Sequence, residues 1–140
     1  WKGTGHLHDF TFVTPTFRNG EIVALFASTC HVVDIGGRGM TPDSRQIYEE
    51  GLFIPLMHFA RAGKVEQAII DIVGANVREA VQVVGDLHSL ATCNEIACRR
   101  LVEMMDEFGI TDLDRLGAHI LAKSKAATLE FEGEALVINA

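Results

Sequence analysis

Histidine and aspartate side chains gather at two places in the first third of the sequence. His6, His8 and Asp9 stand at the head of an apolar run that alternates like a β-strand, and His31 and Asp34 stand at the end of the next run. Imidazole nitrogens and carboxylate oxygens are ligands that zinc, manganese and iron accept in proteins. The two groups could therefore form one metal site if the fold brings them together.

A turn signal separates the two apolar runs. Asn19-Gly20 is typical of a two-residue hairpin turn, because both central residues of a type I′ turn need positive φ. The sequence thus predicts an antiparallel β-hairpin in which Arg18 faces Glu21.

This register predicts which polar residues meet. It places His8 opposite His31 and His6 diagonal to His31 on the same face of the hairpin. We therefore expect His6 and His31 to converge on a divalent metal, with Asp34 as the third ligand. The alternative is that these histidines are structural, and a bulge at Pro15 would move His6 or His8 to the other face.

Other candidate residues carry weaker signals. The glycine-rich stretch 36–39 lacks the spacing of a phosphate-binding loop, which favours a conformational role. His58 is a further candidate ligand, whereas His88 and His119 lie in helical patterns and are predicted to be structural or solvated. The sequence assigns no residue a catalytic role.

The rest of the chain is mostly helical in pattern. Apolar periodicity and turn residues predict an extended segment at 52–56 and a strand pair within the alternating stretch 129–138. They also predict helices over 42–50, with Thr41 as the N-cap, and over 64–74, 81–108 and 112–126. The fold class is therefore α+β, an N-terminal antiparallel hairpin followed by a helical half. We expect a single domain over 1–140, with a β-rich metal-site half at 1–58, a helical half at 64–127 and a tail at 128–140.

Composition excludes several classes of partner. The net charge of −7 argues against nucleic-acid binding, because such proteins cluster Lys and Arg on one surface. No apolar run approaches the roughly 18–20 residues that cross a bilayer, so no membrane partner is expected. The three cysteines lack C-x-x-C spacing, which favours a reducing cytoplasm over a disulfide framework.

Several sequence segments, which occur in the same order along the chain, resemble those of the hydantoinase B family. This family includes N-methylhydantoinase B, 5-oxoprolinase and the large subunits of acetone-type carboxylases. The resemblance covers about residues 1–127 and rests on these segments, in this order: GTGHLHDFTFVTPTF, HVVDIGG, PDSRQIYEEGL, ANVR, GDL and ACRRLVEMMDEFG.

The resemblance implies a function and a partner. Family members act with a hydantoinase A-type subunit that uses ATP, and they hydrolyse a cyclic amide or carboxylate a ketone, so a small-molecule substrate and a homo- or hetero-oligomer are expected. The family's metal-binding histidines match His6 and His31. The resemblance also implies an acidic ligand upstream of the first of them, which would be absent from this chain.

Family chains are also several hundred residues long. The resemblance therefore implies a segment or reduced form that binds metal weakly and is inactive alone. The alternative is a non-catalytic binding or assembly module that keeps the family fold.

Overall fold

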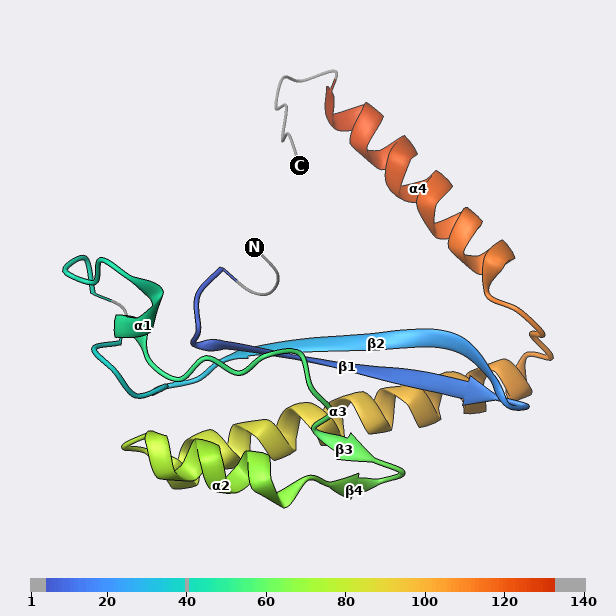
Figure 1. Cartoon of the computed structure of the whole chain (residues 1–140). Helices are drawn as coiled ribbons and strands as arrows, with labels where there is room; N and C mark the ends of the chain where they lie inside the picture. Colours follow the sequence, from blue (N-terminus) through green and yellow to red (C-terminus); the bar gives the residue numbers. More distant parts are fainter. Residues whose placement is uncertain (1–4, 40, 133–140) are drawn as a thin grey trace. The chain divides into compact units, whose positions relative to one another are not determined.

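The computed structural model describes residues 5–39 and 41–132, and it has the predicted α+β architecture (Figure 1). The elements in chain order are β1 (Asp9–Arg18), β2 (Glu21–His31), α1 (Ile47–Glu50), β3 (Ala60–Arg61), β4 (Lys64–Val65), α2 (Gln67–Asn76), α3 (Ala80–Glu107) and α4 (Asp114–Glu132). Two compact units divide the chain, one ending at Arg100 and one beginning at Leu101. This boundary lies inside α3, and the single-domain organisation stays a prediction.

Strands β1 and β2 form the predicted antiparallel hairpin. The turn residues Asn19 and Gly20 have φ values of 54° and 85°, as a type I′ turn requires. Next to the turn, Arg18 pairs with Glu21, as expected from the sequence.

A β-bulge then changes the register. Thr16 pairs with Ala24 while Phe17 pairs with Ile22, which leaves Val23 as an extra residue in β2. The extra residue places the half-buried Phe26 on the inner face and leaves the neighbouring Leu25 outside, 65% exposed. Burial of the aromatic ring is a physical reason for the bulge, because a one-residue slip exchanges the two faces of a strand.

Because of the bulge, the cross-strand partner of His31 differs from the one predicted. Asp9, not His8, pairs with His31 at the open end of the hairpin. His6 also lies in the turn before β1 rather than on the strand itself.

The inner face of the hairpin and the helices of the first unit enclose the core. The part of helix α3 that belongs to the first unit runs along the hairpin (Figure 1). The buried Asn94 on this part donates through Nδ2 to the carbonyl of Phe12 at 3.1 Å and to Thr14 Oγ1 at 3.3 Å. The buried hydrophobic residues of this core are Val32, Ile35, Ile69, Val73, Val83 and Leu87.

The segment after the hairpin is less helical than predicted. Only Ile47–Glu50 form a helix, and Thr41 closes a turn instead, accepting the Asp43 N–H on Oγ1 at 3.3 Å. Helix α1 ends at Glu50 with Gly51 as its C-cap, and residues 52–56, for which an extended segment is predicted, belong to no helix or strand.

The remaining helices differ from prediction mainly at their ends. A small hairpin, β3 with β4, turns at Ala62 and Gly63, so α2 begins at Gln67 instead of residue 64 and continues past Gly74. Helix α3 matches the predicted range within one residue at each end.

The second unit contains the end of α3 and helix α4. Asp112 Oδ1 accepts the Asp114 N–H at 3.1 Å, and α4 continues to Glu132. The strand predicted from residue 129 is wrong for 129–132, which are helical, and its remainder lies outside the described residues. Among the described helices, none combines the length and apolar character that a bilayer crossing requires.

Candidate metal centre

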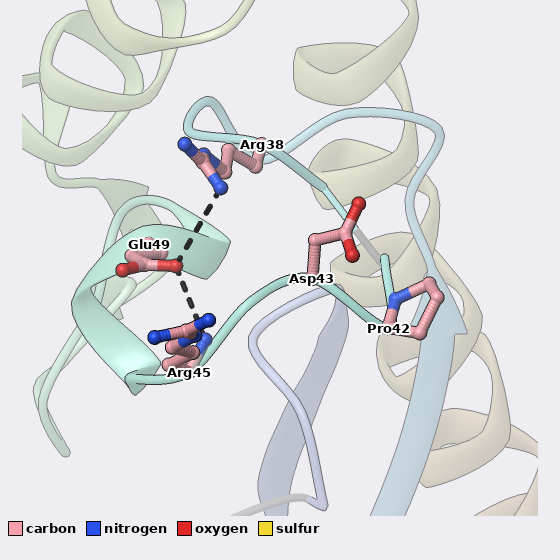
Figure 2. A pocket seen from close by; sticks show the side chains of 5 residues that line it. All are labelled: Arg38, Pro42, Asp43, Arg45 and Glu49. Carbon is pink, nitrogen blue, oxygen red and sulfur yellow. Dashed lines mark hydrogen bonds and ion pairs between the residues drawn. The ribbon is translucent and has the colours of Figure 1, made fainter.

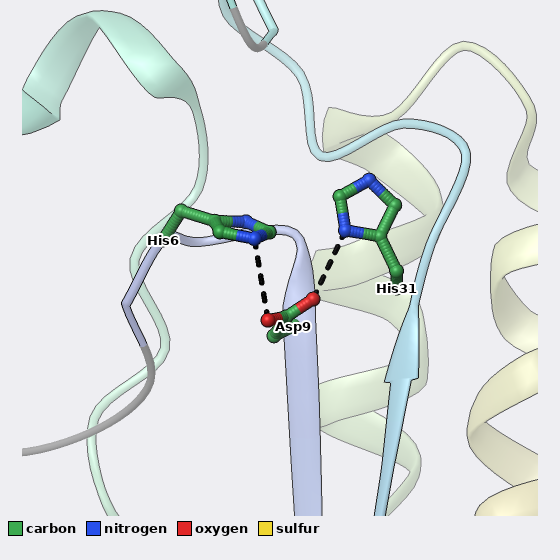
Figure 3. Close-up of side chains that lie close together, drawn as sticks. All are labelled: His6, Asp9 and His31. Carbon is green, nitrogen blue, oxygen red and sulfur yellow. Dashed lines mark hydrogen bonds and ion pairs between the residues drawn. The ribbon is translucent and has the colours of Figure 1, made fainter. Parts of the chain in front are cut away.

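Asp9 lies between the two histidines that the sequence singled out (Figure 3). Its Oδ2 is 3.2 Å from His6 Nε2, and its Oδ1 is 3.0 Å from His31 Nδ1. The ring centroids of His6 and His31 are 4.9 Å apart. The structure thus brings His6 and His31 together and adds Asp9 as the shared carboxylate.

The hairpin positions two of these three side chains directly. Asp9 begins β1 and His31 ends β2, and as cross-strand partners they project from the same face. The N–H of Val32 donates to the carbonyl of His8 at 2.9 Å, which extends the ladder by one bond toward the cluster.

His8 forms the buried side of the cluster. Its side chain is buried, and its ring stacks on His31 with centroids 5.2 Å apart and planes 14° apart. Burial, followed by the nearby His31 and His6 imidazoles, lowers the pKa of His8 from its usual 6.5, which favours the neutral ring. Its Nδ1 has no hydrogen-bond partner among the residues that the structure describes.

The donor set of the cluster fits a divalent metal ion. One donor atom from each of His6, Asp9 and His31 lies within 4.8 Å of the others. Donors bound to one ion at roughly 2.1 Å lie within about 4.2 Å of one another, so small side-chain adjustments reach bonding distance. Two imidazoles and one carboxylate suit zinc, iron or manganese and leave coordination positions for water or substrate.

Asp34, the third ligand predicted from the sequence, is bound elsewhere. Its Oδ1 accepts Arg78 Nε and the Gly36 N–H, each at 3.1 Å, and the Arg78 backbone N–H and Nη2 donate to the same carboxylate. Hydrogen bonds from Arg78 hold the pKa of Asp34 well below its usual range, and the hydrogen bond from the Gly36 N–H adds to the effect. Asp34 would have to leave Arg78 to bind the same ion as His31, and its role as a ligand stays a prediction.

The other sequence candidates lie outside the cluster. His58 is exposed in the segment before β3, and His119 is exposed on α4. His88, which lies on α3, packs edge-on to Phe59 with ring centroids 6.1 Å apart. Arg38, Pro42, Asp43, Arg45 and Glu49 line a separate polar pocket of about 540 Å³ (Figure 2).

Sequence reasoning missed the central role of Asp9 and a contact from Glu50. The sequence shows that Asp9 follows His6 by three positions. It does not show that Asp9 pairs with His31, because that pairing depends on the bulge. Glu50 Oε2 accepts the N–H of Leu7 at 2.8 Å from 43 positions further along the chain, and no sequence pattern indicated this contact.

Comparison with known proteins supplies the family. The hydantoinase B/oxoprolinase family model matches residues 1–131. Caprolactamase subunit beta of Pseudomonas jessenii is 32% identical over 108 residues, which are 75% of this chain and 19% of that protein. The 5-oxoprolinase of Dictyostelium discoideum is 28% identical over 128 residues, 89% of this chain and 10% of that protein.

A solved structure agrees with these relatives. The crystal structure of the ATP-dependent caprolactamase from Pseudomonas jessenii matches with a TM-score of 0.71 at 30% identity, over 84% of this chain and 20% of that chain. This chain belongs to the hydantoinase B/oxoprolinase family. It spans about a fifth or less of the length of these relatives.

Proposed function

We propose that this chain is a segment of a hydantoinase B-type component and carries histidine ligands of its metal site. The complete assembly would open a cyclic amide together with an ATP-using, hydantoinase A-type partner subunit. The cluster of His6, Asp9 and His31, in a chain whose relatives include a caprolactamase and 5-oxoprolinases, is the observation that carries the proposal.

The chain's own residues would hold and orient the metal. The His6 and His31 nitrogens and the Asp9 carboxylate supply donors, and the buried neutral ring of His8 supports His31 from one side. A bound zinc, manganese or iron ion supplies a Lewis acid that polarises a carbonyl oxygen or lowers the pKa of a water molecule. The same chemistry serves ketone carboxylation, the other reaction of the family.

The proposal also concerns assembly and location. Because the chain spans so small a part of its relatives, we expect it to be inactive alone and to work within a larger homo- or hetero-oligomer. ATP would enter through the partner subunit. A cytoplasmic location is part of the proposal, and the three free cysteines support it because they favour a reducing compartment.

A second candidate function is a non-catalytic assembly module. The outer face of the hairpin favours it, because apolar side chains there are more than half exposed: Val13, Phe17, Ile22 and Leu25. Such a face is typical of a surface that another polypeptide covers.

Calorimetric titration with Zn²⁺ and Mn²⁺ tests the metal site. Relative to the unsubstituted chain, we expect His31→Ala and Asp9→Asn each to weaken binding at least tenfold, since each removes one of about three protein ligands. His119→Ala, the same substitution at an exposed histidine outside the cluster, is the control and should leave affinity unchanged.

An Asp34→Asn variant distinguishes the two carboxylates. If Asp9 is the ligand, Asp34→Asn keeps the metal affinity, whereas a tenfold loss would restore the ligand set predicted from the sequence. Equal binding by the unsubstituted chain, His31→Ala and Asp9→Asn would mean that the cluster is structural.

A further inference from the structure

Glu50 contacts the loop that carries two of the clustered histidines. Its Oε2 accepts the N–H of Leu7 at 2.8 Å, and Leu7 lies between His6 and His8. Within the loop, the turn bond from the Asp9 N–H to the His6 carbonyl is longer, 3.4 Å. Of these two hydrogen bonds, the one between Leu7 and the Glu50 carboxylate is therefore the shorter.

The backbone that carries Glu50 is held firmly in place. The Leu52 N–H donates to the Ile35 carbonyl and the Arg38 N–H to the Glu49 carbonyl, both at 2.8 Å. A Cβ added at Gly51 would lie 2.2 Å from the Ile35 carbonyl oxygen, so the two segments are in direct backbone contact. Because Ile35 is fully buried, this contact connects the segment of Glu50 to the hydrophobic core of the first unit.

From this geometry we infer that Glu50 is a positioning residue for the metal centre, an inference that rests on the proposed function. Glu50 is not in the group that could ligate the ion, which consists of His6, Asp9 and His31. It acts through the Leu7 peptide, which fixes the backbone from which the His6 imidazole reaches Asp9. Outer residues that orient metal ligands commonly change metal affinity by about 10- to 100-fold when they are substituted.

Zinc titration of two Glu50 variants tests this role. Glu50→Ala removes the acceptor, and we expect a loss of Zn²⁺ affinity of about 10-fold or more. Glu50→Gln keeps an oxygen that can accept the Leu7 N–H, and we expect its affinity to stay within about threefold of the unsubstituted chain.

Glu49→Ala is the matched control from the same segment. The Glu49 carboxylate accepts the Arg45 N–H at 3.1 Å and lies 4.0 Å from Arg38 Nη1, contacts that belong to the separate pocket (Figure 2). Its loss should leave the affinity for Zn²⁺ unchanged.

Three results would overturn the inference. One is Zn²⁺ binding by Glu50→Ala as tight as that of the unsubstituted chain. Another is an equal loss in Glu50→Gln and Glu50→Ala, which would point to the charge instead of the hydrogen bond. The third needs no variant to fold: rapid hydrogen exchange of the Leu7 amide in the unsubstituted chain would show that the bond is absent, whereas slow exchange supports it.

The His31→Ala variant separates this inference from the proposed metal site. If His31→Ala binds Zn²⁺ as well as the unsubstituted chain, the metal site fails. If His31→Ala loses binding and Glu50→Ala does not, only the role of Glu50 fails.

Discussion

Asp9 and Asp34 each follow a histidine by three positions, yet they have different partners in the structure. Asp9 contacts His6 and His31, whereas Asp34 receives its hydrogen bonds from Arg78 and the Gly36 amide. Arg78 lies 44 positions beyond Asp34 in the sequence. Spacing along the chain therefore identified both carboxylates as candidates, but the choice between them depends on a distant arginine.

The Asp34–Arg78 pair predicts a dependence of stability on pH. The folded-state pKa of Asp34 lies below its ordinary value of 3.8, so its stabilising effect is complete above that value and is lost as the pH falls toward the folded pKa. Because Arg78 is largely exposed, we expect Asp34→Asn to cost only about 1–2 kcal/mol at neutral pH.

Urea unfolding at a series of pH values measures this effect. The difference in stability between the unsubstituted chain and Asp34→Asn should narrow as the pH falls below 3.8. A difference that stays constant down to the lowest pH at which both proteins fold would contradict the assignment.

At the scale of elements, the bulge in β2 has the largest effect on the site. It changes the partner of His31 from His8 to Asp9 and keeps Phe26 on the inner face. The long helix α3 was predictable because its apolar period continues for many turns. A single extra residue has no comparable signature, so the hairpin could be predicted from the sequence and its register could not.

The proximity of His6 and His31 was predicted despite this error. Both the predicted and the observed register bring the start of β1 beside the end of β2, within reach of long side chains. The wrong predictions for 42–46 and 129–132 have another cause. Short segments have little periodicity of their own, and residues 129–132 continue the helix that precedes them.

The close contact between Gly51 and Ile35 predicts how much stability a substitution at Gly51 would cost. Gly51 has a φ of 145°, and an added Cβ would lie 2.2 Å from the Ile35 carbonyl oxygen, so we expect Gly51→Ala to cost more than about 3 kcal/mol. Gly63 has a φ of 75° with open space around it, and Gly63→Ala should cost about 1 kcal/mol. Chemical unfolding of both variants provides the comparison, and equal losses would show that the segments are not in contact.

At the scale of the whole molecule, the chain spans only about a fifth of the length of its relatives. The exposed apolar side chains on the outer face of its hairpin are consistent with that size difference. Leu25 is central among them, because it faces Pro15 across the strands and is 65% exposed.

We expect the isolated chain to self-associate through this face as its concentration rises. Leu25→Glu should shift the equilibrium toward monomer, because association would then bury an unpaired charge. Sedimentation velocity over a range of concentrations measures this, with Gln82→Glu on the exposed side of α3 as a control that adds the same charge. An unsubstituted chain that stays monomeric at every concentration would contradict the expectation.

Besides its two faces, the hairpin has two edges, one along β1 and one along β2. In the described part of the chain β1 and β2 pair only with each other, so each strand has peptide groups that point sideways without a ladder partner. Pro15 deprives β1 of one N–H, whereas β2 contains no proline along its 11 residues. The outer edge of β2 is therefore the place where an additional strand would join most readily, whether to widen the sheet in a longer protein or to start fibrils in a concentrated solution of this segment.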